Sequence, residues 1–396
     1  MSLSDTPRAN RIHIGIFGKR NSGKSSLINA LTRQNTALVS EIAGTTADPV
    51  YKAMEIYGIG PCVFIDTAGF DDEGFLGEMR VKKTIEAIDK TDIALLVFGK
   101  DKPVRELEWI AMLKEAKVPI VAIINKADII PDTTILFGEI EKICGKKPLI
   151  VSAKEKTGID AIREAIIRLL PSDYEASSIT EGIVNEGDTV LLVMPQDIQA
   201  PKGRLILPQV QTTRDLLDKK CIVISATTDK LDQALAALTS PPDVIITDSQ
   251  VFKTVYEKKP ASSKLTSFSV LYANYKGDLD YYIKSAEVLG TLSNHSKVLI
   301  AEACTHVPLT EDIGKEKIPR MLRETAGANI TIDHVSGPDF PKDLSQYDLI
   351  IQCGACMFNR KHVLSRIEKA KKQDVPMTNY GIVMAYMNHI LDKISY

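Results

Sequence analysis

The sequence lacks any apolar run of the roughly 18 residues that a membrane-spanning helix needs. Its first eight residues, Met-Ser-Leu-Ser-Asp-Thr-Pro-Arg, lack the apolar core of a signal peptide. Positive and negative charges are nearly balanced, with 49 Lys and Arg and 51 Asp and Glu. Proteins that bind long nucleic acids usually contain an excess of basic residues. We therefore expect a cytoplasmic protein that binds neither a membrane nor a nucleic acid.

Cysteine is scarce, with six in 396 residues, and no segment shows low complexity or an internal repeat. In a cytoplasmic chain, thiols are more often reduced or metal-bound than paired in disulfides. Three cysteines lie in or beside apolar runs, where we expect them to pack in cores: Cys62, Cys144 and Cys221. The other three fall in the last quarter and are taken up below.

Short apolar strands alternate with helical patterns along most of the chain, which predicts an α/β fold with mostly parallel sheets. Polar stretches at residues 171–183 and 257–263 suggest linkers. They divide the chain into an N-terminal P-loop domain (1–171), a middle α/β domain (172–263) and a third α/β domain (264–396). The strands that we predict are 12–17, 63–65, 93–98, 118–124, 149–151, 189–193, 221–225, 244–247, 298–301 and 348–352. The main helices begin at residue 24 or span 159–170, 205–219, 230–238 and 382–391.

A phosphate-binding loop occupies residues 18–25, Gly18-Lys-Arg-Asn-Ser-Gly23-Lys24-Ser25. It follows a predicted strand and opens a predicted helix, which distinguishes such a loop from a chance match. Its glycines let backbone N–H groups approach phosphates, and the helix N-terminus adds partial positive charge. We predict that Lys24 reaches the β- and γ-phosphates and that the Ser25 hydroxyl binds Mg²⁺.

Two further segments would respond to the γ-phosphate. Asp66-Thr-Ala-Gly69 ends an apolar strand, so Asp66 can hold Mg²⁺ through water while the Gly69 N–H faces the γ-phosphate. Of the neighbouring Thr45 and Thr46, we expect Thr46 to complete the Mg²⁺ shell only while the γ-phosphate is present. The predicted catalytic residues are therefore Lys24, Ser25, Thr46, Asp66 and Gly69.

Guanine selection is predicted from Asn125-Lys126-Ala-Asp128, which follows an apolar strand. The Asp128 carboxylate can accept two N–H bonds from guanine, and adenine lacks that donor pair. Ser152-Ala153-Lys154 follows the next strand and can supply a backbone N–H for guanine O6. The complete predicted site for GTP and GDP comprises Gly18, Asn21, Ser22, Gly23, Lys24, Ser25, Ser26, Thr45, Thr46, Asp66, Gly69, Asn125, Lys126, Asp128, Ser152, Ala153 and Lys154.

With these motifs in order, the N-terminal domain resembles the TrmE/Era group of translation-factor-like GTPases. Phe70 stands where a Ras-like enzyme has its water-orienting glutamine, so we expect slow intrinsic hydrolysis. In the TrmE/Era group the residue equivalent to Asn21 is associated with a K⁺ ion next to the phosphates. The resemblance therefore implies K⁺ stimulation through Asn21.

Cysteines also follow two predicted strands near the C-terminus, as Cys304-Thr-His306 and Cys353-Gly-Ala-Cys356. The carboxyl ends of strands in an open α/β sheet meet in one crevice, so the three thiols can converge on one centre. Three thiolates suit an iron–sulfur cluster, whose usual protein shell is four cysteines. A Zn²⁺ site of three cysteines and one histidine stays open as the alternative.

A TrmE/Era-like domain, a middle α/β segment and the two cysteine motifs together resemble the HydF family of FeFe-hydrogenase maturation GTPases over essentially the whole chain. The family carries a second histidine directly before its Cys-x-x-Cys pair, where this sequence has Gln352. The resemblance implies a [4Fe–4S] cluster on Cys304, Cys353 and Cys356. Its fourth ligand stays open: His306, a carboxylate, water or an exchangeable position.

The same resemblance implies a transient di-iron precursor, made by HydE- and HydG-type radical maturases and delivered to apo FeFe-hydrogenase. It also implies a homodimer formed through the middle domain. Whether GTP drives loading or release stays open. The alternative function is a TrmE/Era-type GTPase of RNA modification or ribosome assembly with structural zinc, but the near-neutral charge argues against it. A radical enzyme is excluded because no Cys-x3-Cys-x2-Cys triplet occurs.

Overall fold

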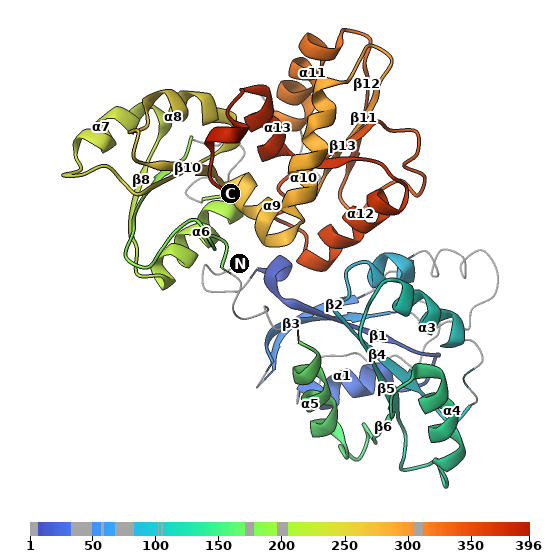
Figure 1. Ribbon diagram of the computed structural model, residues 1–396. Helices are drawn as coiled ribbons and strands as arrows, with labels where there is room; N and C mark the ends of the chain where they lie inside the picture. The colour runs from blue at the N-terminus through green and yellow to red at the C-terminus, as the bar shows by residue number, and fades with distance from the viewer. Residues whose placement is uncertain are drawn as a thin grey trace. The chain divides into compact units, whose positions relative to one another are not determined.

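The computed structural model describes residues 7–32, 50–56, 59–67, 83–101, 103, 106–170, 178–195, 205–303 and 312–396. The chain divides into two compact units, residues 1–174 and 175–396 (Figure 1). Some residues singled out from the sequence lie outside the described ranges: Thr45, Thr46, Gly69, Phe70, Cys304 and His306. None of the described helices is long and apolar enough to cross a membrane.

The first unit is built on a six-stranded sheet in the order β2-β3-β1-β4-β5-β6 (Figure 1). Its neighbouring strands are parallel except β2, which runs antiparallel to β3. The central strands β1 and β4 are buried at every residue, as expected for parallel strands covered on both faces. The strands are β1 Ile12–Phe17, β2 Val50–Ile56, β3 Gly60–Asp66, β4 Ile93–Phe98, β5 Ile120–Ile124 and β6 Leu149–Ile150.

Helices cover both faces of this sheet. On one face α1 (Lys24–Thr32) and α5 (Ile159–Leu169) pack against alternate residues of the central strands. On the other face α3 (Glu106–Glu115) and α4 (Thr134–Cys144) bury a second cluster. Because both faces are covered, the carboxyl ends of the strands are left to form the site, as open α/β sheets require.

The second unit contains two four-stranded parallel sheets, in the orders β10-β9-β7-β8 and β12-β11-β13-β14. The first has β7 Thr189–Val193, β8 Ile222–Ala226, β9 Val244–Thr247 and β10 Lys264–Ser267. The second has β11 Lys297–Glu302, β12 Thr331–Ser336, β13 Leu349–Gln352 and β14 Met377–Asn379.

The helices of the second unit are α6 Leu207–Asp218, α7 Leu231–Ala236, α8 Phe252–Lys258, α9 Phe268–Lys276, α10 Leu279–Ala286, α11 Ile318–Ala326, α12 Arg360–Lys372 and α13 Tyr380–Met387. Short helical turns are η1 Arg8–Asn10 in the first unit and, in the second, η2 Thr228–Lys230, η3 Ser249–Val251, η4 Glu287–Gly290, η5 Ile313–Lys317 and η6 Leu391–Lys393.

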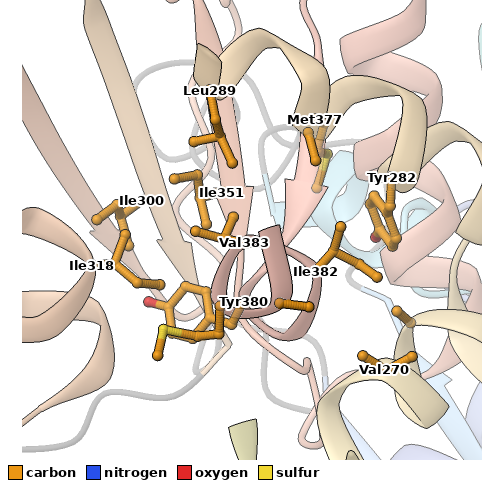
Figure 2. Close-up of a cluster of buried hydrophobic side chains, with 14 of the residues drawn as sticks. Val270, Tyr282, Leu289, Ile300, Ile318, Ile351, Met377, Tyr380, Ile382 and Val383 are labelled. Atoms are coloured by element: carbon orange, nitrogen blue, oxygen red, sulfur yellow. The ribbon is translucent and has the colours of Figure 1, made fainter. Parts of the chain in front are cut away.

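One hydrophobic cluster joins the two sheets of the second unit. It takes Leu191 and Ile245 from the first sheet together with Ile300 and Ile351 from the second. Figure 2 shows the part of the cluster around β11, β13 and β14, where Met377 lies among the side chains of the strands and α13. The two sheets therefore share a core, in keeping with their grouping in one compact unit.

The predicted α/β class is confirmed, and the predicted strands 12–17, 93–98, 189–193 and 244–247 match the observed bounds. The prediction at 382–391 is displaced, because α13 spans Tyr380–Met387 and ends before a 3₁₀ turn. Four strands were not predicted: β2, β10, β12 and β14. Each lies at the edge of its sheet, and polar residues interrupt the apolar pattern of each.

The predicted division into three domains stays a prediction. The polar stretch 257–263 joins α8 to β10, and β10 pairs with β9, so the first sheet of the second unit extends to Ser267. The three cysteines expected in cores are reduced. Cys62 and Cys221 are buried, and Cys144 is partly buried against the cluster under α3 and α4.

Candidate functional site

The phosphate loop joins β1 to α1. The Lys24 ammonium donates hydrogen bonds to the backbone oxygens of Gly18 and Lys19, at 2.9 and 3.0 Å, so it lies inside the loop. Gly18 and Gly23 have φ angles of 153° and 91°. A Cβ at Gly18 would collide with the backbone oxygen of Val97, and one at Gly23 with the side-chain nitrogen of Asn125. Only glycine lets the loop approach these neighbours.

One polar atom of this loop is buried without a protein partner. The Ser22 hydroxyl has no hydrogen-bond partner in the described part of the chain, although Ser22 is only 4% exposed. A buried hydroxyl normally has a partner, so its position in a phosphate loop points to a ligand oxygen. Asn21 beside it is exposed and adopts the left-handed conformation at φ 58°, which asparagine tolerates better than most residues.

The expected Mg²⁺ ligands meet at the carboxyl end of β3. The Ser25 hydroxyl lies 3.3 Å from the Asp66 carboxylate and donates to it. Burial raises the pKa of Asp66, and the positive charges of Lys24 and Lys52 counteract that shift. Thr67 fixes the strand end, because its hydroxyl donates to the Ile16 backbone oxygen at 2.6 Å. Hydroxyl and carboxylate oxygens are the ligands that Mg²⁺ prefers.

Asn125 connects the guanine segment to the phosphate loop. Its side-chain nitrogen donates to the Ser22 backbone oxygen at 2.9 Å, and its side-chain oxygen accepts from the Ala153 N–H at 3.0 Å. Asn125 is only 1% exposed. Asn125 therefore connects the loops that follow β1, β5 and β6, which is a structural role in addition to base recognition.

The carboxylate of Asp128, which is predicted to select guanine, is held in place by the next loop. Asp128 accepts from the Ser152 hydroxyl at 2.6 Å, and this bond lowers the pKa of the carboxyl, which therefore stays ionised. The N–H groups of Ser152 and Ala153 donate to Thr157 and Asn125. Among the described residues, the Lys154 N–H is the member of the triplet left without an acceptor, so it can serve guanine O6.

The structure thus brings the described residues of the predicted nucleotide site to one edge of the sheet. Motif matching did not single out two contacts there. Lys19 pairs at 3.4 Å with the buried Glu106 at the start of α3. Trp109 in the same helix stacks on Phe17, with ring centroids 6.3 Å apart, directly before the loop. Glu106 and Trp109 belong to no motif, so the sequence patterns did not single them out.

A second candidate site is the turn after β13, residues 353–358, which we call the thiol turn. The Cys353 sulfur accepts hydrogen bonds from the N–H groups of Ala303 and Ala355, at 3.1 and 3.4 Å. Ala355 adopts a left-handed conformation with φ 49°, which folds the turn around the sulfur. Burial raises the pKa of the Cys353 thiol to about 11, and the two N–H groups counteract that shift.

Ala303 directly precedes Cys304, which lies outside the described residues. Because β11 and β13 are parallel neighbours with Ala301 opposite Gln352, their carboxyl ends lie together. The residue before one cysteine motif therefore contacts the sulfur of the other. The predicted convergence of the three thiols stays a prediction, because Cys304 lies outside the described residues.

Gln352 does not act as a free replacement for the missing histidine. It is 1% exposed, and its side-chain oxygen accepts from Arg366 at 3.1 Å. Arg366 is equally buried, donates to the Gly337 backbone oxygen at 2.6 Å and lies between the rings of Phe340 and Phe358. Gln352 is held by a buried arginine, which favours a structural role for it.

Lys276, at the end of α9, lies beneath the thiol turn and is 1% exposed. Its ammonium donates to the backbone oxygens of Phe358, Cys356 and Ala355, at 2.7, 3.2 and 3.5 Å. Burial lowers the pKa of Lys276 to about 8, and the charges of Cys356 and Cys353 counteract that shift. No motif predicted this residue, because a lysine in the last turn of a helix is an ordinary terminal charge.

The described residues contain no cluster of three or more Cys, His, Asp or Glu side chains able to hold a metal ion. The thiol turn nevertheless fits a metal–thiolate centre. Its sulfur accepts two backbone N–H bonds, as the sulfurs of iron–sulfur proteins do, and a buried cation lies beneath it. Cys353 and Cys356 would be two of the ligands, and the chemistry of thiolates suits iron or zinc.

Three family models match consecutive segments of the chain. Residues 13–126 match a model described as a 50S ribosome-binding GTPase. Residues 179–277 match the hydrogen maturase F dimerization domain, and residues 280–395 match the hydrogen maturase F tetramerization domain. The last two models together span nearly all of the second unit.

The chain belongs to the hydrogen maturase F family. It has a P-loop GTPase domain followed by the two domains that this family names for dimerization and tetramerization. The third segment, predicted to bind a cluster, is the one named for tetramerization.

Curated relatives of this hydrogen maturase F chain share its GTPase part. The tRNA modification GTPase MnmE of Flavobacterium johnsoniae is 30% identical over 191 residues, which cover 46% of this chain and 39% of the relative. GTPase Der of Wolinella succinogenes is 36% identical over 171 residues, covering 40% and 36%. The chain thus spans about two fifths or less of these relatives. They support binding of GTP, GDP and Mg²⁺.

Among solved structures, an Era variant from Aquifex aeolicus bound to GDP and tetrafluoroaluminate matches 40% of this chain and 57% of its own chain. The sequence identity is 25% and the TM-score is 0.37.

Proposed function

We propose that the chain is a GTP-switched scaffold that holds an iron–sulfur cluster and carries a di-iron precursor to apo FeFe-hydrogenase. The observation that carries the proposal is the bond from the Ala303 N–H to the Cys353 sulfur, in a chain whose second unit belongs to the hydrogen maturase F family. This bond places the segment entering Cys304 against the Cys-x-x-Cys turn.

In the GTPase domain, Lys24 binds the β- and γ-phosphates, and Ser25 and Asp66 hold Mg²⁺. Asp128 and the Lys154 N–H read guanine, while Asn125 keeps their loop against the phosphate loop. Further roles fall to residues outside the described ranges: Thr46 completes the Mg²⁺ shell, Gly69 binds the γ-phosphate, and Thr45 lines the site. Ser22, Gly23 and Ser26 complete the phosphate cradle, with Gly18 at its start.

Asn21 supports the proposed K⁺ stimulation by its position, since its exposed side chain lies on the rim of the phosphate loop. A cation there would add positive charge next to the phosphates, where negative charge develops during hydrolysis. We propose that hydrolysis is slow and acts as a switch, because release of the γ-phosphate frees the segment around Thr46.

In the second unit, Cys304, Cys353 and Cys356 are the proposed ligands, and His306 is a candidate for the fourth. A [4Fe–4S] cluster bound there would offer one iron without a cysteine ligand, open to an exchangeable molecule. The chain's own contribution is to hold the thiol turn with N–H bonds. Arg366 binds the side-chain oxygen of Gln352, whose side-chain nitrogen donates to the Cys353 sulfur at 3.8 Å. HydE- and HydG-type maturases would supply the precursor.

The test is anaerobic reconstitution with iron and sulfide, followed by metal analysis and visible absorption. The full-length chain is compared with Cys304→Ser, Cys353→Ser and Cys356→Ser. Cys144→Ser is the matched control, because this thiol ends α4 in the first unit and packs against the hydrophobic cluster under α3 and α4. About four irons per chain are expected in the parent and the control.

Each of the three substitutions should lower the iron content and the absorption. Stoichiometric zinc without iron uptake would overturn the scaffold proposal. It would favour instead a TrmE/Era-type GTPase with a structural zinc site, whose RNA binding could then be measured as a function of salt.

A further inference from the structure

Lys276 lies in an unusual position for a lysine. Fully buried lysines are rare unless they are paired with an opposite charge, and no carboxylate among the described residues forms an ion pair with it. Its ammonium is instead surrounded by three backbone oxygens, from Phe358, Cys356 and Ala355, and it lies 5.2 Å from the centre of the Tyr272 ring.

Backbone oxygens and an aromatic face offset only part of the cost of burying a cation. The anions that could complete the compensation are the thiolates of Cys353 and Cys356, which are among the groups that interact electrostatically with Lys276. Cysteine ligands of a metal are thiolates, so a metal bound at the thiol turn would bring negative charge next to the Lys276 ammonium.

We propose that Lys276 is a positioning residue for the metal–thiolate centre: it holds the thiol turn through three backbone oxygens and lends its positive charge to the ligated cysteines. This inference rests on the proposed cluster function and assigns a role to α9, a helix about eighty residues earlier in the chain. A fixed positive charge stabilises the more negative, reduced form of a cluster, so it raises the midpoint potential.

The packing around Lys276 also connects the thiol turn to α9. Cys356 packs partly buried against the cluster that contains Phe268, Leu271 and Tyr272 of α9. The same helix contacts α13 and α6, so it lies between the two sheets of the second unit. Lys276 therefore connects α9, in the segment matched by the dimerization model, to the thiol turn, in the segment matched by the tetramerization model.

The experiment compares the reconstituted full-length chain with Lys276→Met and Lys276→Gln. The methionine variant keeps roughly the length of the side chain and removes both the charge and the donor. The glutamine variant removes the charge and keeps a donor on a shorter side chain. Lys264→Met is the matched control, because the Lys264 ammonium also donates to a backbone oxygen, that of Ile183 at 3.1 Å, but its residue is exposed. The readouts are iron content, midpoint potential by EPR-monitored titration, and amide hydrogen exchange of residues 353–358 in the metal-free chain.

We expect both Lys276 variants to bind iron and to show a ratio of reduced to oxidised cluster about tenfold lower at a fixed potential. For one electron this corresponds to a midpoint about 59 mV more negative. Amide exchange of the thiol turn should be faster in Lys276→Met than in Lys276→Gln, and Lys264→Met should match the parent in all three readouts.

Two failures can be told apart. A parent chain that takes up no iron overturns the proposed function and the inference with it. A loaded parent and loaded variants with equal midpoints overturn the inference alone. Loss of the folded second unit in both Lys276 variants, judged by circular dichroism, would assign a purely structural role and also overturn it.

Discussion

The two candidate sites of this chain are built in different ways. The nucleotide site is formed by loops whose motif residues contact one another: Asn125 bonds to the phosphate loop, and Ser152 bonds to Asp128. The thiol turn is held by residues that belong to no motif, namely Lys276 beneath it and Arg366 beside it. The motif residues of the nucleotide site therefore contact one another directly, whereas the cysteine motifs supply only the metal ligands and not the residues that hold them.

The difference follows from the ligand that each site takes. Phosphates are recognised by backbone N–H groups, so the loop sequence itself specifies the site. A metal–thiolate centre needs its negative charge compensated and its turn fixed, and partners from anywhere in the fold can do both. The predictions below probe whether the nucleotide site is self-contained and whether the thiol turn depends on remote residues.

The largest effect is expected at the phosphate loop. Lys24→Met removes the ammonium that lies inside the loop, and we expect kcat/KM for GTP to fall by about 10²–10³, as for other lost electrostatic contacts to a transition state. Steady-state phosphate release measures this. Lys142→Met on the exposed face of α4 is the control and should keep the parent rate. An unchanged rate in Lys24→Met would exclude a phosphate-binding role for this lysine.

The next effect concerns the remote support of the thiol turn. Arg366→Met leaves the oxygens of Gln352 and Gly337 without their donor and removes a cation from between two aromatic rings. We expect the free energy of unfolding of the second unit to fall by about 3 kcal/mol. Denaturant titration by circular dichroism measures it. Arg214→Met, at an exposed pair with Asp218, should leave stability unchanged. Equal behaviour of the two variants would contradict the account.

Base selection should change at Asp128. In Asp128→Asn the amide can no longer accept both N–H bonds from guanine but can donate to an oxygen at that position. We therefore expect GTP affinity to fall about tenfold to a hundredfold and xanthosine triphosphate to bind better than in the parent. Competition binding measures both. Asp132→Asn, in the same connection but bonded only to the start of α4, is the control and should keep guanine preference. Retained preference in Asp128→Asn would refute the assignment.

The smallest effect is a spectroscopic one. Trp109 is the only tryptophan in the chain and stacks on Phe17, the residue before the phosphate loop. We expect GTP, but not ATP, to change its emission, because a movement of the loop on phosphate binding would shift Phe17 against the Trp109 ring. A stopped-flow titration would detect the change. Emission that stays constant while a labelled guanine nucleotide binds would show that the loop is rigid.

Most of the nucleotide site could be predicted because its residues are contiguous within loops that follow predicted strands. The contacts between these residues could not be predicted. Nothing in the sequence shows that Asn125 connects three loops or that the Ala153 N–H donates to its side chain. Thr46 and Gly69 lie outside the described residues, so their roles stay predictions. The strands β2, β10, β12 and β14 were missed because polar residues interrupt their apolar pattern, whereas the edge strands β6 and β8 were predicted.

At the thiol turn the sequence could supply the cysteines and their placement after strands, but not their supports. Lys276 is 80 residues from Cys356 and resembles a charge at a helix end. The meaning of Gln352 depends on Arg366, which also carries no sequence signal because buried arginines look like exposed ones in the sequence. Long-range partners of this kind follow from packing and not from local pattern.

The most direct test of the account is the EPR spectrum of the reconstituted and reduced chain, compared with those of Cys353→Ser and Lys24→Met. The account predicts a cluster signal in the parent that Cys353→Ser weakens and Lys24→Met keeps, because the two sites are built from separate parts of the chain. A parent that binds zinc and gives no cluster signal would contradict it.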